Sequence, residues 1–176
     1  MVMISQLRTP YRKRIRLSLE AYRQLGAICS ITVALRERRP VFLDQLVAEG
    51  AVDVLDQLAT RTGTPVYAYC LMPDHVHLLI GPSPSCDIID FVGQFKNLVQ
   101  RLAWRHGIQG RIWQTSFWDH FLRVDEDIPR AANYILNNPV RRGLVTRWEE
   151  YSHSGSFVFP VRPGSGGQAP ALRSAT

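Results

Sequence analysis

The chain has 176 residues, of which 45% are hydrophobic, so it is long enough for one domain with a proper core. Its net charge of +6 favours a polyanionic partner such as nucleic acid. No apolar run approaches the roughly 20 residues of a membrane-spanning helix, and basic residues interrupt the N-terminus where a secretion signal would be apolar. Three cysteines without zinc-like spacing predict a reduced, cytoplasmic protein.

The first half of the chain predicts a strand, a helix and two further strands. Residues 1–25 read as a basic arm with little apolar periodicity. Alternating apolar residues predict a first strand over 27–35, and apolar residues at helical spacing predict a helix over 42–60. A second strand is predicted over 66–72 and a third over 75–81, joined by a tight hairpin connection.

The second half predicts a helix, a strand and a further helix. Apolar side chains recur every three or four residues over 87–106, which is typical of a long amphipathic helix. A fourth strand is predicted over 112–124, and a third helix from about residue 125 to 137, where Asn138-Pro139 ends it.

The order of these elements predicts the fold class. Strand, helix, strand, strand, helix and strand form a split β-α-β pattern, which gives an α+β, ferredoxin-like antiparallel sheet with helices on one face. We expect this domain over residues 26–159, between the basic arm of 1–25 and a tail over 160–176. The tail is rich in Gly, Pro, Ser and Ala, and we expect it to be disordered.

Two histidines, His75 and His77, flank a single valine in the third predicted strand. Successive side chains in a strand alternate between faces, so both imidazoles point the same way and can share one divalent metal ion. Two ligands do not complete a site, so a third has to come from elsewhere in the chain. The spacing alone also fits a pair of structural or exposed histidines, which is the commoner case.

Basic residues occur in clusters with aromatic residues among them. Basic side chains for phosphates and aromatic rings for unstacked bases are what a single-strand binder needs, although core packing accounts for most aromatic residues. We predict that phosphate contacts come from Arg12, Lys13, Arg14, Arg16, Lys96, Arg101 and Arg105.

Four sequence blocks follow one another in a specific order and spacing. They are Met72-Pro73-Asp74-His75-Val76-His77-Leu78-Leu79, then Ile112-Trp113-Gln114 with Phe117-Trp118-Asp119-His120, then Tyr134-Ile135-Leu136-Asn137-Asn138-Pro139-Val140, and Arg142-Gly143-Leu144-Val145. Together these blocks resemble the single-tyrosine HUH transposases, where HUH stands for His, a bulky hydrophobic residue and His. The resemblance is strongest to the REP-associated tyrosine transposases of bacteria.

The resemblance implies which residues form the site. It places the paired histidines on a central strand, and it matches the family's nucleophilic tyrosine to Tyr134. Asn138 matches a polar residue that helps to hold the metal. His120 is a weaker candidate, because it could assist the metal site, contact DNA or be structural. Without the resemblance, Tyr134 would be read as a core tyrosine of an amphipathic helix.

The resemblance also implies a reaction. A divalent ion, Mg²⁺ or Mn²⁺, withdraws charge from a phosphodiester, and the tyrosine attacks to leave a 5′-phosphotyrosine and a free 3′-hydroxyl. This covalent step conserves bond energy for rejoining without ATP. We therefore expect a site-specific single-stranded DNA endonuclease and strand transferase. Its partner would be single-stranded or REP-like hairpin DNA, and it would act as a monomer or homodimer associated with the bacterial nucleoid.

Two other functions stay open. One is a catalytically silent, nucleic-acid-binding regulator that keeps the fold, and the intact His75, His77 and Tyr134 argue against it. The other is a rolling-circle replication initiator or relaxase, which shares the histidine pair. The block that begins at Tyr134 argues against that second alternative.

Overall fold

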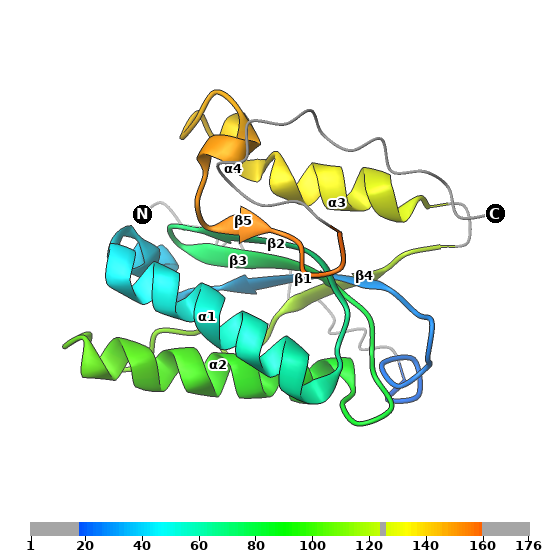
Figure 1. Cartoon of the computed structure of the whole chain (residues 1–176). Coiled ribbons are helices and arrows are strands. Elements are labelled where there is room, and N and C mark those ends of the chain that lie inside the picture. Colours follow the sequence, from blue (N-terminus) through cyan, green and yellow to red (C-terminus); the bar gives the residue numbers. More distant parts are fainter. Residues whose placement is uncertain (1–17, 124–125, 160–176) are drawn as a thin grey trace, which may run out of the picture.

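The structure is a computed structural model that describes residues 18–123 and 126–159. Five strands form one antiparallel sheet in the order β4-β1-β3-β2-β5. The strands are β1 (Cys29–Ala34), β2 (Val66–Met72), β3 (His75–Ile80), β4 (Trp118–Phe121) and β5 (Ser154–Gly155). The first four have the ferredoxin-like order, so the predicted fold class is confirmed, with β3 at the centre of the sheet (Figure 1).

Two long helices cover one face of the sheet, as predicted (Figure 1). Helix α1 (Gln45–Thr62) begins at Asp44, whose carboxylate accepts a hydrogen bond from the Val47 N–H, and it ends at Gly63 in the left-handed conformation. Helix α2 (Ile88–Arg105) begins in the same way at Asp87. The two helices and the sheet enclose the main core, to which β3 contributes Val76, Leu78 and Ile80.

A glycine in α1 lies where these two helices approach each other. A Cβ atom at Gly50 would lie 2.8 Å from Cδ2 of Leu102 in α2. A glycine lowers helix propensity by about 1 kcal/mol relative to alanine, so the helix gives up local stability at this position for tight packing against its neighbour.

The predicted pattern placed the helices on one face of the sheet, whereas a third helix, which follows β4, covers the opposite face (Figure 1). Helix α3 (Ile128–Leu136) packs against β2 and β3 and is followed at once by the short α4 (Asn138–Arg141). The second core lies beneath α3. Its members include Ala68, Cys70, Met72 and Leu79 from the sheet and Ala132, Ile135 and Leu136 from α3.

The connections are where the structure departs from the sequence prediction. The fourth strand is shorter than the predicted 112–124, because Trp113 forms only an isolated bridge with Leu35 and donates its indole N–H to the Lys96 carbonyl at 2.8 Å. Short 3₁₀ turns occur over Arg36–Arg38, Val41–Leu43 and Trp148–Glu150.

The closing segment adds a fifth strand that the sequence did not predict. Trp148 is buried in the second core, Tyr151 donates its hydroxyl to the Leu71 carbonyl at 2.8 Å, and β5 pairs with β2 through Ser154 and Gly155. The tail over 160–176 and the arm up to residue 17 lie outside the described residues. Within the described part of the chain, no helix is long and apolar enough to cross a membrane.

Candidate active site

The two histidines of β3 lie on the face of the sheet that α3 covers. His75 pairs with Ala34 on one side and Met72 on the other, and His77 pairs with Thr32 and Cys70. Directly opposed residues of neighbouring strands share a face, and Cys70 and Met72 belong to the core beneath α3. The predicted common orientation of the imidazoles is therefore present, and their Nε2 atoms are 2.9 Å apart.

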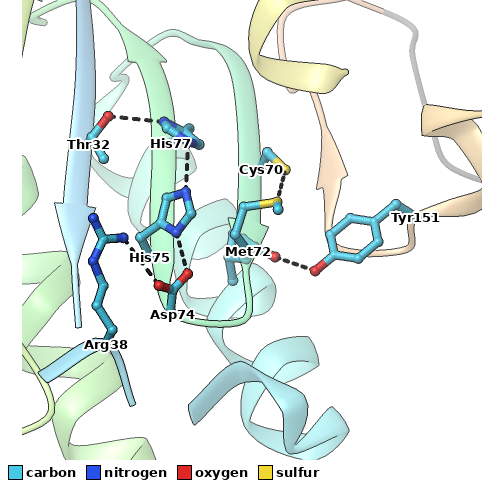
Figure 2. A network of polar contacts seen from close by, with 9 residues as sticks. Thr32, Arg38, Cys70, Met72, Asp74, His75, His77 and Tyr151 are labelled. Atoms are coloured by element: carbon cyan, nitrogen blue, oxygen red, sulfur yellow. Dashed lines mark hydrogen bonds and ion pairs between the residues drawn. The ribbon is translucent and has the colours of Figure 1, made fainter. Parts of the chain in front are cut away.

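Each imidazole also forms a hydrogen bond through its Nδ1 atom to a second residue (Figure 2). Nδ1 of His75 is 2.6 Å from Oδ1 of Asp74, and Nδ1 of His77 is 3.0 Å from Oγ1 of Thr32. Arg38 in turn donates to the Asp74 carboxylate at 3.2 Å. With both Nδ1 atoms engaged, the two Nε2 atoms face each other at hydrogen-bonding distance, 2.9 Å apart (Figure 2). The Thr32 hydroxyl can donate or accept, so it supports either tautomer of His77.

The surroundings keep both imidazoles neutral. Burial is the main cause that lowers the pKa of His77 to about 3, and the nearby His75 and Arg141 act in the same direction, because a second proton on His77 would be repelled by them. Burial also lowers the pKa of His75, although its hydrogen bond to Asp74 opposes that shift. Partial burial favours a raised pKa at Asp74, but the His75 hydrogen bond and the charges of His75 and Arg38 lower it overall. A neutral imidazole is the form that binds a metal ion.

The histidine pair fits a shared divalent ion. Two ligand nitrogens at about 2.1 Å from one ion and at right angles to each other are about 3.0 Å apart, and the Nε2 separation here is 2.9 Å. No group of three His, Cys, Asp or Glu side chains within the described residues could hold a metal ion. The pair is thus an open, two-ligand arrangement.

Tyr134 and Asn138 lie one helical turn apart, where α3 passes into α4. The Tyr134 side chain is 64% exposed, and the guanidinium carbon of Arg141 lies 3.8 Å from its ring centroid. Asn138 donates Nδ2 to the Ile135 carbonyl at 3.0 Å and accepts at Oδ1 from Arg141 at 2.8 Å. The structure brings Tyr134 and Asn138 together, but the hydrogen bonds of Asn138 do not reach the histidines.

His120 lies on the same face of the sheet as the histidine pair, on the edge strand β4. It pairs with Ser30 of β1, and its Nε2 is 3.1 Å from both carboxylate oxygens of Glu126. His120, Ser30, Glu126, Arg130 and Tyr134 line one cavity of about 500 Å³. The structure therefore places His120 and the predicted nucleophile in the lining of one cavity, while the hydrogen-bond partner of His120 is Glu126 rather than either histidine of β3.

Comparison with known proteins identifies the family. Residues 26–126, more than half of the chain, match the model of the IS200-like transposases. The chain belongs to this family. A REP-associated tyrosine transposase of Escherichia coli is 27% identical to this transposase over 132 residues, which are 73% of this chain and 76% of the relative. A Haemophilus influenzae protein assigned to the same group is 27% identical over 165 residues, or 84% and 92% of the two chains.

A solved structure supports the same grouping. The structure of a REP-associated tyrosine transposase bound to a REP hairpin matches this transposase with a TM-score of 0.61 and 25% identity, over 76% of this chain and 78% of that one. The ISDra2 transposase TnpA of Deinococcus radiodurans is 34% identical over 76 residues, which are 42% of this chain and 54% of that protein. The predicted resemblance to REP-associated tyrosine transposases is thus confirmed.

The basic residues predicted to bind phosphates are not all on the histidine face of this transposase. Arg101 and Arg105 of α2 line a groove of about 540 Å³ together with Arg61, on the opposite side of the sheet. Lys96 donates its ammonium group to the carbonyls of Gln114 and Thr115, at 2.7 and 3.4 Å. Arg12, Lys13, Arg14 and Arg16 lie outside the described residues.

Thr32 and Arg141 belong to the site but had no predicted role. Thr32 holds His77 across 45 positions of sequence, and only the register of β1 against β3 reveals this contact. Arg141 is not among the basic residues predicted to bind phosphates, yet it contacts both Tyr134 and Asn138. The signal for Arg141 is its spacing of three residues from Asn138, which is one turn of a continuing helix.

Proposed function

We propose that this transposase cleaves and rejoins single-stranded DNA beside a REP-like hairpin, with Tyr134 as nucleophile and a divalent ion held by His75 and His77. The observation that carries the proposal is the pair of neutral imidazoles whose Nε2 atoms are 2.9 Å apart, on the side of the sheet where α3 carries Tyr134. A core tyrosine is a poor alternative reading, because the Tyr134 side chain is 64% exposed.

The residues around the histidine pair would bind and position the metal ion. His75 and His77 would hold Mg²⁺ or Mn²⁺, which supplies charge withdrawal from a non-bridging phosphate oxygen. Asp74 and Thr32 fix the two rings, and Asn138 offers an amide oxygen from the turn after Tyr134. We assign no metal contact to His120, because its Nε2 is bonded to Glu126.

The chemical step transfers a phosphoryl group from a 3′-oxygen of the DNA to the Tyr134 oxygen. The Tyr134 oxygen forms a bond to phosphorus, and the bond from phosphorus to the 3′-oxygen of the preceding nucleotide breaks. The 3′-oxygen leaves with the bonding electron pair and takes up a proton from water to become the 3′-hydroxyl, while the phenolic proton goes to a base. His120 lies in the same cavity as Tyr134 and has Glu126 behind it, so it is the residue that we assign as this base.

The substrate assignment is tested by competition for binding. The probe is a labelled hairpin with a single-stranded flank, taken from the DNA beside the protein's own gene. An unlabelled copy of this hairpin is expected to displace the probe at a concentration at least about tenfold lower than a fully paired duplex needs. The reason is that stacking on aromatic side chains requires unpaired bases. If the duplex competes equally well, single-strand recognition is wrong, and the regulator reading gains support.

The affinity for DNA is expected to fall steeply as salt rises. Each phosphate that a Lys or Arg neutralises releases counterions, so the logarithm of the affinity falls with the logarithm of the salt concentration. Deleting residues 1–16 should make this slope shallower and weaken binding to all sequences alike, because phosphate contacts carry little sequence information. A titration at several salt concentrations measures both. An unchanged slope in the shortened protein would show that the arm does not contact phosphates.

The residues behind the imidazoles are expected to control metal affinity. Asp74→Ala and Thr32→Val each remove the partner of one Nδ1 atom, and the loss of such a partner typically weakens metal binding 10–100-fold. Titration with Mn²⁺ measures this loss. Asp53→Ala is the matched control, because Asp53 is an exposed carboxylate of α1 on the other side of the sheet. Equal Mn²⁺ affinity in Asp74→Ala and Asp53→Ala would contradict the metal assignment.

A further inference from the structure

Arg141, the last residue of α4, contacts the predicted nucleophile and the predicted metal ligand at once. Its guanidinium carbon lies 3.8 Å from the centroid of the Tyr134 ring. Nη1 donates to the Tyr134 carbonyl at 2.9 Å, and Nη2 donates to Oδ1 of Asn138 at 2.8 Å. A planar guanidinium with five donors can stack and donate hydrogen bonds simultaneously, which a lysine ammonium cannot do. One side chain thus joins Tyr134 to Asn138.

These contacts occupy the atom of Asn138 that a metal ion needs. Nδ2 of Asn138 is a donor and is already bonded to the carbonyls of Ile135 and Tyr134, at 3.0 and 3.4 Å. Oδ1 is therefore the only side-chain atom of Asn138 that can bind a cation. Because the positive guanidinium of Arg141 is bonded to this oxygen, it repels a second cation from the same place.

The guanidinium of Arg141 is exposed and stacks on the ring of the predicted nucleophile. The negative phosphate group to be attacked would also have to lie beside this nucleophile.

We propose that Arg141 is a phosphate-operated latch. In the free protein its guanidinium is bonded to Asn138 and covers the Tyr134 ring. A charged phosphodiester is a better partner for a guanidinium than a neutral amide oxygen is. When DNA enters, Arg141 moves to the phosphate and leaves Oδ1 of Asn138 free to join His75 and His77 around the ion. This inference rests on the proposed function, because it takes a phosphodiester as the incoming group.

The latch couples two binding events. If DNA releases Asn138 for the ion, then DNA raises the affinity for the ion, and by reciprocity the ion raises the affinity for DNA by the same factor. Removing Arg141 should uncouple the two. The free protein should then bind the ion more tightly, while the reaction should become slower because the phosphate has lost its guanidinium.

The test compares Mn²⁺ affinities in the absence of DNA, measured by electron paramagnetic resonance. Arg141→Ala is expected to bind Mn²⁺ about fivefold more tightly than Arg142→Ala, and the double variant Asn138→Ala with Arg141→Ala should lose this gain. Arg142 is the matched control, because it is exposed and its charge also lowers the pKa of His77, while no hydrogen bond joins its side chain to Tyr134 or Asn138. Equal affinities in the two single variants, or no Mn²⁺ binding by any variant, would overturn the latch.

A second comparison separates the latch from the proposed reaction. Addition of decathymidylate should raise the Mn²⁺ affinity of the wild type but not that of Arg141→Ala, and Arg141→Lys should behave like Arg141→Ala because an ammonium cannot make the paired contacts. An equal rise in the wild type and Arg141→Ala would overturn the latch. If the wild type forms no covalent DNA adduct but the Mn²⁺ ordering holds, the strand-transfer function is wrong and the latch stands. If the adduct forms but the ordering is absent, only the latch is wrong.

Discussion

Replacing Tyr134 by phenylalanine is expected to reduce formation of the covalent protein–DNA adduct by at least about three orders of magnitude, because the substitution removes the attacking oxygen. The fold should be unaffected. The side chain is 64% exposed, and the hydrogen bond from Arg141 to residue 134 uses the backbone carbonyl, which phenylalanine keeps. The adduct is measured by denaturing electrophoresis of labelled strands incubated with Mn²⁺.

The matched control for this substitution is Tyr67→Phe. Tyr67 lies on β2, is half-buried and contacts Phe159 through its ring, so its hydroxyl can be removed at a comparable structural cost. Adduct yield in Tyr67→Phe should equal that of the wild type, and DNA affinity should stay within about twofold in both variants. An adduct of wild-type yield in Tyr134→Phe would reject Tyr134 as the nucleophile.

Replacing His75 and His77 by alanine is expected to lower the cleavage rate by roughly a thousandfold, because a metal ion at a phosphoryl oxygen contributes several kcal/mol of charge stabilisation. Excess EDTA should have the same effect on the wild type, and added Mn²⁺ should restore only the wild type. Single-turnover cleavage of a labelled strand measures the rate. The two imidazoles are the pair whose Nε2 atoms are 2.9 Å apart.

Folding has to be monitored in this variant, because His75 is buried and its loss leaves Asp74 with Arg38 as its remaining partner. Thermal unfolding serves this purpose, and His77→Gln is a milder second substitution. His106→Ala is the control, since His106 is an exposed histidine at the end of α2. Cleavage by the wild type at full rate in excess chelator would show that the reaction does not depend on a metal ion.

The sequence predicted those helices and strands whose formation depends on neighbouring residues in the chain. The predicted strand over 66–72 matches β2, and the predicted helix over 87–106 matches α2 to within one residue at each end. The apolar run of β2 and the capping aspartate of α2 are visible in a short window of sequence. The two-residue β5 left no such pattern, because its formation depends on the edge of β2, more than 80 positions earlier in the chain.

Helix α4 shows how a correct local rule can mislead. Pro139 was predicted to end the third helix, because proline disfavours a helical conformation in the preceding residue. In the structure α3 does end at Leu136, but Pro139 then lies in the first turn of α4, where proline is well accepted. The new helical turn is what brings Arg141 back over Tyr134. The latch could therefore not be predicted from the sequence pattern.

The candidate site also combines features that the local sequence predicts with features that depend on distant parts of the chain. The common direction of His75 and His77 follows from strand alternation alone, and the structure has it. The position of α3 over the histidine face, and the hydrogen bond from Thr32 to His77, depend on which strands become neighbours. These are long-range properties of the sheet, and a single sequence does not encode them in any short pattern.

The central claim is that Tyr134 becomes joined to DNA, and identifying the modified residue tests it most directly. The wild-type protein is incubated with Mn²⁺ and a single strand from the DNA flanking its gene, then digested with trypsin and a nuclease and analysed by mass spectrometry. We predict a nucleotide attached through its 5′-phosphate to Tyr134, in the tryptic peptide that runs from Ala131 to Arg141. A nucleotide on any other residue, or complete cleavage of the strand with no modified peptide, would contradict the claim.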